Sequence, residues 1–168
     1  MSFKTLHDKA QDYVFNHTWL LHALAYPMRA EQKIFEMIFR KHIENKTSCV
    51  FTMPDTIFGG RAFGKSTLIL KLANTYHLPV YVYYVSRREL LQEECARMGY
   101  TVDVYDATAM YLSVCKPSDD KKVILVDEPA TLGQIQTQFF DTNFIPIGFA
   151  HEDKTLHAKQ PFGCYEIR

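Results

Sequence analysis

The first part of the chain carries its apolar residues at the spacing of an amphipathic helix. Between Phe3 and about Asn45 they recur every three or four positions, and Pro27 interrupts the stripe before it resumes at Ile34. A proline suits the first turn of a helix, because that position needs no backbone donor. The pattern therefore predicts two helices that meet near Pro27. We expect residues 1–46 to form a helical cover over the rest of the chain, although a helical pair that binds a partner would have the same pattern.

From Thr47 onward, short apolar runs alternate with amphipathic segments. The two capping-box patterns, Ser86-Arg-Arg-Glu89 and Thr131-Leu-Gly-Gln134, indicate helix starts, and Gly99 is placed to end the first of these helices. Strands are predicted at 48–53 (with a continuation to 58 left open), 80–85, 101–105, 123–126 and 144–149, and helices at 65–76, 86–99 and after 131.

The connection between the first predicted strand and the following helix matches G-x-x-x-x-G-K-[ST] in full. Its glycines would let backbone N–H groups approach phosphate oxygens closely, and the helix that follows adds its N-terminal dipole. Lys65 would place an ammonium group on the β- and γ-phosphates, and Ser66 a hydroxyl on Mg²⁺. The motif predicts a site for ATP and Mg²⁺ formed by Gly59, Gly60, Arg61, Ala62, Phe63, Gly64, Lys65, Ser66 and Thr67.

A second element completes such a site, an apolar strand that ends in acidic residues. The run Val123-Ile-Leu-Val126 is followed directly by Asp127 and Glu128. Asp127 would hold Mg²⁺ through a water, and Glu128 would polarise a water for attack on the γ-phosphate. Two acids after a strand are common by themselves, but beside a phosphate loop they predict that the nucleotide is hydrolysed.

The alternation of strands and helices predicts the fold. Strands that alternate with helices imply a parallel sheet with right-handed crossovers, and uninterrupted apolar strands imply that both faces are covered. We therefore expect residues 47–168 to form one compact α/β unit, a three-layer α/β/α P-loop fold with an N-terminal helical extension. Its mainly parallel sheet should have about five strands, with 144–149 between 48–53 and 123–126.

Composition narrows the function classes only a little. The 168 residues are 47% hydrophobic and 23% charged, and 19 Lys and Arg balance 19 Asp and Glu. This balance excludes a strongly basic nucleic-acid tail and a charge-driven disordered chain, but it leaves open a local basic face.

The compartment is predicted from cysteines and hydropathy. The four cysteines, Cys49, Cys95, Cys115 and Cys164, form no CxxC pair, which favours buried or free thiols in a reducing compartment. The most apolar early stretch, 19–28, is too short to span a bilayer. We expect a cytoplasmic protein, or one of the host cytoplasm if it belongs to a phage, with no membrane partner.

At its two motifs the chain resembles the ATPase domain of phage terminase large subunits and, more widely, the additional-strand class of P-loop NTPases, which includes superfamily 2 helicases. The resemblance covers about 47–150, and only the two short motifs are specific. It implies ATP hydrolysis on or beside nucleic acid. It also implies that Arg61, four residues before Lys65, is an arginine finger acting in cis, which would stabilise charge on the γ-phosphoryl oxygens.

Three further roles follow from the same resemblance. Arg87 and Arg88 lie at a predicted helix start, in an element that tends to face nucleic acid in such ATPases. The N-terminus of a helix is the positive end of its dipole and disfavours cations. Two arginines at this position are therefore compatible with a phosphate contact, although surface solvation explains their presence equally well. His151 lies where these ATPases carry a coupling or sensor residue.

The chain also departs from this family. Few residues follow 144–150, so we expect neither the nuclease domain of a terminase nor the second motor domain of a helicase. The chain would then act as a homo-oligomer or with a protein partner. Three other functions stay open: a nucleotide switch that regulates a protein partner, a small-molecule or nucleoside kinase, and a non-hydrolysing interaction module.

Overall fold

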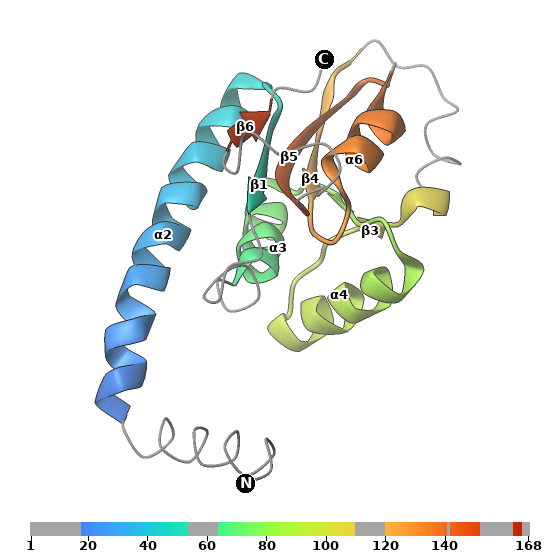
Figure 1. Ribbon diagram of the computed structural model, residues 1–168. Helices are drawn as coiled ribbons and strands as arrows, with labels where there is room; N and C mark the ends of the chain where they lie inside the picture. Colours follow the sequence, from blue (N-terminus) through green and yellow to red (C-terminus); the bar gives the residue numbers. More distant parts are fainter. Residues whose placement is uncertain (1–17, 54–63, 110–119, 141, 152–162, 166–168) are drawn as a thin grey trace, which may run out of the picture.

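A computed structural model describes residues 18–53, 64–109, 120–140, 142–151 and 163–165 of the chain (Figure 1). Helices and strands alternate along most of it. The elements are α2 (Thr18–Asn45), β1 (Cys49–Met53), α3 (Lys65–Tyr76), β2 (Val80–Tyr81), α4 (Val85–Met98), β3 (Val104–Tyr105), β4 (Lys122–Val126), α6 (Leu132–Phe139), β5 (Phe144–His151) and β6 (Gly163–Tyr165).

The strands form one sheet in the order β3-β2-β4-β5-β1-β6. The strands from β3 to β1 pair in parallel, while β6 pairs antiparallel with β1. The predicted parallel sheet is confirmed, and so is the position of β5 between β1 and β4. The short antiparallel edge strand β6 was not predicted, because its three residues carry no clear strand pattern.

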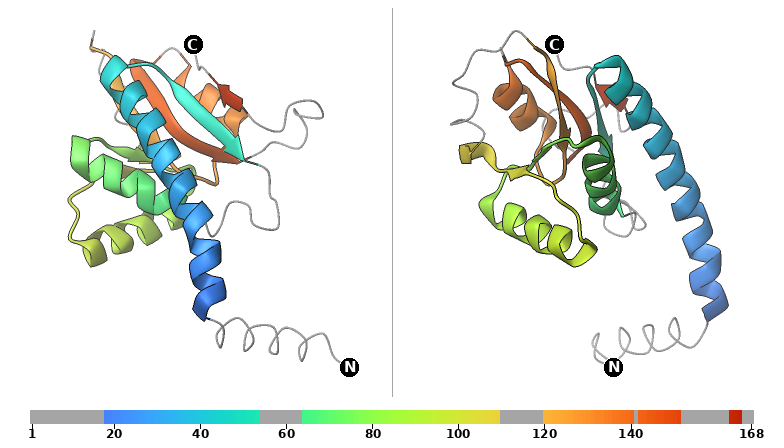
Figure 2. Two further views of the ribbon diagram at one scale, coloured as in Figure 1. Left: turned by 90° about the vertical axis from the view of Figure 1, so that its left-hand side faces the viewer. Right: turned by 180° about the vertical axis from the view of Figure 1, so that it is seen from behind.

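Helices cover both faces of this sheet, so the chain has a mixed α/β fold. The two faces of β4 explain why it is apolar from Val123 to Val126: Val123 and Leu125 belong to one apolar cluster, and Ile124 and Val126 to the other. Residues of α2, α3 and α4 complete the first cluster, and residues of α6 complete the second. Figure 2 shows α2 crossing in front of the sheet in its left view, with α6 behind it.

In the described part of the N-terminal segment, residues 18–45, one helix replaces the two that were expected to meet near Pro27. Helix α2 runs without a break through Pro27 and is 28 residues long. A proline inside a helix removes one hydrogen bond and strains the preceding turn, but it does not force the helix to end. The carboxyl-terminal half is held by aromatic contacts, since the ring of Phe35 lies 5.0 Å from that of Phe51 and 5.2 Å from that of Phe149.

Three local predictions in the middle of the chain are wrong. The strand expected at 80–85 pairs only at Val80 and Tyr81, because α4 begins already at Val85. The capping box expected at Ser86 therefore does not form, and the helix is capped by Tyr84 without a side-chain hydrogen bond. The strand expected at 101–105 is likewise reduced to Val104–Tyr105.

Other local signals were interpreted correctly. Gly99 ends α4 in the left-handed conformation, at φ 68°. The capping box at Thr131 is complete, since its hydroxyl accepts from the Gln134 N–H and the Gln134 side chain accepts from the Thr131 N–H. Helix α3 spans the predicted residues, Lys65–Tyr76.

The cysteine prediction needs a correction. Cys49, at the buried start of β1, is disulfide-bonded, whereas Cys95 in α4 is a free buried thiol. Cysteines that are distant in sequence can meet across a sheet, so their spacing along the chain could not reveal this bond. Because disulfides persist in oxidising surroundings, cysteine usage no longer supports a reducing compartment.

Among the helices that the structure describes, none is long and apolar enough to cross a membrane.

A glycine in β5 controls how closely β4 and β5 approach each other. Gly148 has φ 152°, and a Cβ there would lie 2.0 Å from the carbonyl oxygen of Val126.

We predict that Gly148→Ala destabilises the fold by about 3 kcal/mol, since it combines backbone strain with overpacking. Gly99→Ala is the matched control: its φ is also positive, but a Cβ would meet nothing within 4 Å, so about 1 kcal/mol is expected. Urea unfolding followed by circular dichroism measures both, and equal losses would contradict the steric explanation.

Candidate functional site

The carboxyl ends of β1, β4 and β5 lie at one edge of the sheet. Parallel pairing aligns Val126, the last residue of β4, with Gly148 of β5, and aligns Met53, the last residue of β1, with His151. Parallel strands present the residues that follow them at this same edge, where ligands usually bind in open α/β sheets. Asp127 follows β4 at this edge, and α3 starts beside it.

The start of α3 has the backbone of a tight turn into a helix. Gly64, its N-cap, has φ 70° and ψ 31°, a conformation that glycine adopts without strain. Among the described residues, no side-chain hydrogen bond caps this end and the first turn holds no acidic residue, so the positive end of the helix dipole is not neutralised there by a carboxylate of the helix itself. Gln32 of α2 donates a hydrogen bond to the Gly64 carbonyl oxygen at 3.3 Å, a contact that the sequence did not indicate.

The structure describes only part of the predicted phosphate loop. Its first five residues, Gly59, Gly60, Arg61, Ala62 and Phe63, lie outside the described residues, and with them the predicted arginine finger. The last four, Gly64, Lys65, Ser66 and Thr67, all line one pocket.

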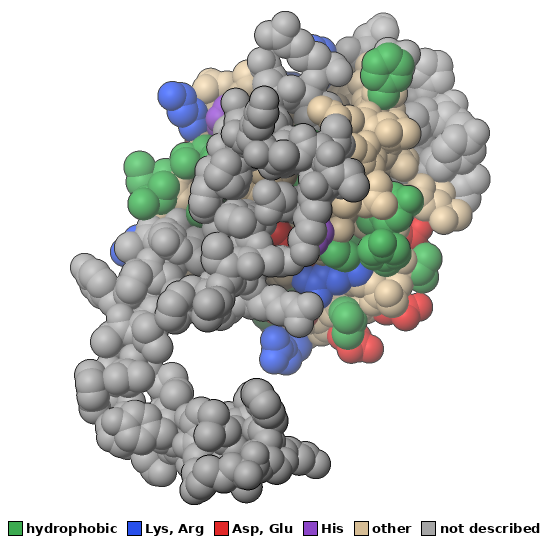
Figure 3. All heavy atoms as spheres, viewed as in Figure 1, with side chains coloured by type: hydrophobic (Ala, Val, Ile, Leu, Met, Phe, Trp, Pro, Cys, Tyr) green, Lys and Arg blue, Asp and Glu red, His purple; other side chains and the backbone are tan. Residues whose placement is uncertain are grey.

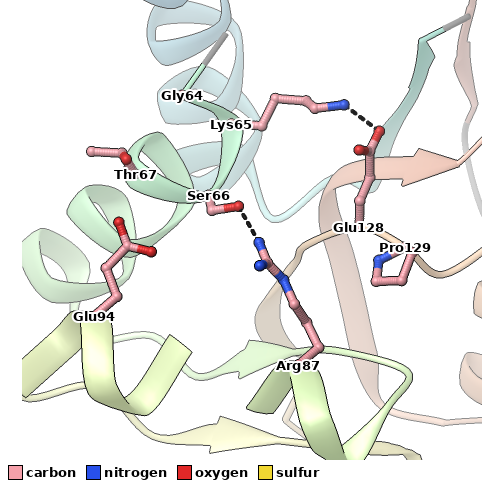
Figure 4. A pocket seen from close by; sticks show the side chains of 8 residues that line it. All are labelled: Gly64, Lys65, Ser66, Thr67, Arg87, Glu94, Glu128 and Pro129. Carbon is pink, nitrogen blue, oxygen red and sulfur yellow. Dashed lines mark hydrogen bonds and ion pairs between the residues drawn. The ribbon is translucent and has the colours of Figure 1, made fainter. Parts of the chain in front are cut away.

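Lys65 and Glu128 form an ion pair across this pocket (Figure 4). The Lys65 side chain is only 5% exposed, and its ammonium nitrogen lies 5.8 Å from the centre of the Phe149 ring. The Glu128 side chain is 22% exposed and contacts this nitrogen through Oε1. A buried ammonium group needs an anionic partner, so the pocket fixes one positive charge beside one carboxylate.

A second polar cluster joins Ser66, Asp127 and Arg87. The Ser66 hydroxyl contacts both carboxylate oxygens of the fully buried Asp127, at 3.1 and 2.9 Å. One guanidinium nitrogen of Arg87, from the first turn of α4, donates to Ser66 Oγ at 2.5 Å and to Asp127 Oδ2 at 2.8 Å. Figure 4 shows Arg87 extending from α4 toward Ser66.

Burial dominates the electrostatics of both acids. It raises the pKa of Asp127, against the opposing effects of Arg87, Ser66 and Lys65. It also raises the pKa of Glu128, which Lys65 and His151 pull in the other direction. His151, the predicted sensor, lies half-buried at the end of β5. Its electrostatic effect on the pKa of Glu128 shows that it lies near the pocket.

Arg88, which was predicted together with Arg87 to face nucleic acid, points elsewhere. Its guanidinium pairs with Asp106 Oδ2 at 2.5 Å, and Asp106 is 2% exposed. Asp106 also accepts hydrogen bonds from the N–H groups of Thr108 and Ala109, both at 2.9 Å. Both arginines therefore have carboxylate partners inside the protein, and their predicted role on nucleic acid stays a prediction.

The pocket that contains the ion pair has a volume of about 490 Å³. Besides the residues predicted from the sequence, Glu94 and Pro129 line it, as does Arg87, which sequence analysis had assigned to a different role. Glu94 lies two helical turns after Arg87 on α4, a spacing that places both on one face once the helix start is known. Figure 3, which has the same viewpoint as Figure 1, shows acidic, basic and histidine side chains together near the middle of this face.

Comparison of the chain with protein-family models, with curated proteins and with solved structures finds no match.

We predict that Lys65 and Glu128 are energetically coupled. Removing either partner leaves the other without its ion pair in a mostly buried place, so a double-mutant cycle with Lys65→Met and Glu128→Gln should give a coupling of about 2 kcal/mol. Urea unfolding of the four proteins measures it.

The control is the ion pair between Lys71 and Glu36, at 3.0 Å, in which the lysine side chain is 50% exposed. Because water screens such a pair, its coupling should stay below about 1 kcal/mol. Equal coupling in the two cycles would show that burial does not strengthen the Lys65–Glu128 contact.

Proposed function

We propose that this chain is a nucleoside triphosphatase that binds ATP with Mg²⁺ and hydrolyses it. One observation carries the proposal: α3 follows β1, which β5 separates from β4 in the sheet, yet the first turn of α3 brings Lys65 and Ser66 against Glu128 and Asp127 at the end of β4. Lys65 and Ser66 belong to one sequence motif, and Asp127 and Glu128 to the other, and the sequence predicts that these two motifs form a single nucleotide site. A P-loop fold is the interpretation that accounts for both the motif and this contact.

The pocket has the chemistry that a triphosphate requires. Its volume of about 490 Å³ lies within the range of small-molecule sites, roughly 300–1,000 Å³. Lys65 offers an ammonium group to the phosphates, and the first turn of α3 offers N–H groups and the positive end of its dipole. A phosphate oxygen would replace Glu128 as the partner of Lys65 and would free that carboxylate to act on water.

The oxygen atoms of Ser66 and Asp127 fit a magnesium ion. Mg²⁺ prefers hard oxygen ligands, and in sites that bind nucleotides it retains several waters and contacts phosphate oxygens. Ser66 Oγ and the Asp127 carboxylate already lie within 3.1 Å of each other. Bound there, the ion would neutralise charge on the β- and γ-phosphates.

Glu128 is suited to activate the attacking water. Its carboxylate would accept a proton as the water oxygen forms a bond to the γ-phosphorus, while the bond from that phosphorus to the bridging oxygen breaks. The products are ADP and inorganic phosphate. Action on or beside nucleic acid would be a further property, and it rests on the resemblance to terminases and helicases rather than on the geometry of Arg87 and Arg88.

We predict that Glu128→Gln lowers ATP turnover by about 10²–10⁴-fold while ATP is still bound, because the amide cannot take a proton. Lys65→Ala should weaken ATP binding as well, since it removes the cation that faces the phosphates. Phosphate release and the binding of a fluorescent ATP analogue measure the two effects separately.

Lys71→Ala is the matched control for this experiment. It removes the same charge from the same helix, but Lys71 is half exposed and pairs with Glu36 of α2, away from the pocket. Its turnover should equal that of the wild type. If wild-type protein neither binds the analogue nor releases phosphate, the proposed function is wrong.

The pH dependence of turnover should also identify Glu128. Only its ionised form accepts a proton, and burial raises its pKa, so activity should fall on acidification at a higher pH than the ordinary glutamate value of about 4.3. His151→Ala should move this acid limb to still higher pH, because it removes an electrostatic contribution that lowers the Glu128 pKa. Profiles of kcat against pH at saturating ATP test this, and an acid limb that does not move in His151→Ala contradicts the assignment.

A further inference from the structure

The guanidinium of Arg87 lies on the two groups that the proposed function assigns to a divalent cation. A single nitrogen of Arg87 contacts Ser66 Oγ at 2.5 Å and Asp127 Oδ2 at 2.8 Å. The Arg87 side chain is 29% exposed and lines the pocket, whereas Asp127 is fully buried. A positive charge from α4 thus neutralises the buried carboxylate.

A metal ion on the Ser66 hydroxyl and the Asp127 carboxylate would have to share these oxygen atoms with the guanidinium. A metal ligand must direct an oxygen lone pair at the ion, at 2.0–2.6 Å for Mg²⁺ or Ca²⁺. Here Asp127 Oδ2 and Ser66 Oγ direct lone pairs at Arg87, and the two cations would also repel each other.

We propose that Arg87 is an internal cation that competes with a divalent metal ion for Ser66 and Asp127, so that metal binding requires Arg87 to leave them. This inference rests on the proposed function, because it takes these two residues as metal ligands. Once displaced, the Arg87 guanidinium stays beside the pocket that it lines, where phosphate oxygens offer it new acceptors.

The neighbouring arginine shows why Arg87 can move without loss of the helix. Arg88 pairs with Asp106, whose other oxygen accepts two backbone N–H groups, and this cluster anchors the start of α4 to the segment after β3. In the part of the chain that the structure describes, the Arg87 guanidinium is hydrogen-bonded to the two groups of the site, so its release leaves the contact between Arg88 and Asp106 in place. The competition therefore links metal occupancy to one side chain of α4.

The test measures binding of Mn²⁺ alone to the full chain, in the absence of nucleotide, from the electron paramagnetic resonance signal of the free ion. If Arg87 blocks the site in about nine molecules of ten, Arg87→Ala should lower the Kd for Mn²⁺ about tenfold. Arg40→Ala is the control: it removes the same charge and also breaks a pair with a carboxylate, Glu36 on α2, and should leave the Kd unchanged. Adding Asp127→Asn to Arg87→Ala should abolish the gain.

Thermal unfolding gives a second readout that does not depend on a signal from the free ion. Arg87→Ala leaves Asp127 buried without a cation, so Mn²⁺ should raise the Tm of this variant more than that of the wild type. Should Arg87→Ala fold poorly, Arg87→Gln removes the charge but keeps donors for Ser66 and Asp127, and it should show the same tighter Mn²⁺ binding.

The outcomes separate the two proposals. Mn²⁺ binding that is unchanged or weaker in both Arg87 variants, or undetectable in all proteins, overturns the competition. Binding of the fluorescent ATP analogue together with Mg²⁺, measured on the same wild-type sample, tests the triphosphate site separately. If the wild-type protein does not bind the analogue, the proposed function is overturned, whatever the Mn²⁺ results.

Discussion

The site depends on two charged side chains that are held almost out of water at one edge of a sheet. Lys65 and Asp127 each need a partner of opposite charge, because an unpaired buried charge is far too costly for a fold of marginal stability. Glu128 and Arg87 are those partners. Each pair joins elements that are distant in sequence, so the start of α3, the end of β4 and the start of α4 must meet for either charge to be tolerated.

The sheet order makes that meeting possible. With β5 placed between β1 and β4, the turn into α3 lies opposite the end of β4 rather than directly beside it, which leaves space for a pocket between them. Strand β5 approaches β4 closely at Gly148, which is aligned with Val126, the residue before Asp127. This close approach helps to set the distance between the turn into α3 and the end of β4. Packing of Phe35 and Phe39 against Phe149 then fixes α2 over the same strand, and Gln32 of α2 reaches the turn at Gly64.

Much of this arrangement could be predicted from the sequence because it follows from strong local patterns. The apolar run before Asp127, the glycine at position 64 before Lys65 and the capping box at Thr131 each determine their own backbone, and parallel connections then bring the strand ends to one edge. The place of Arg87 could not be predicted, since it depends on α4 starting at Val85, before the Ser86 pattern indicated. The disulfide at Cys49 could not be predicted either, since it joins cysteines whose approach no local pattern encodes, and the helix through Pro27 shows that a proline alone does not mark a helix boundary.

The two outer strands have a consequence for how this protein behaves in a crowded solution. An open sheet exposes unpaired backbone groups at its borders, and long, flat borders recruit other chains into aggregates. Here one border is β3, which pairs over only two residues, and the other is β6, a three-residue strand that runs opposite to its neighbour. Neither described edge strand is long enough to pair with a strand of another molecule over many residues. The strands β1 and β4, which lead into the charged pocket, lie inside the sheet, where both neighbours already pair with their backbone groups.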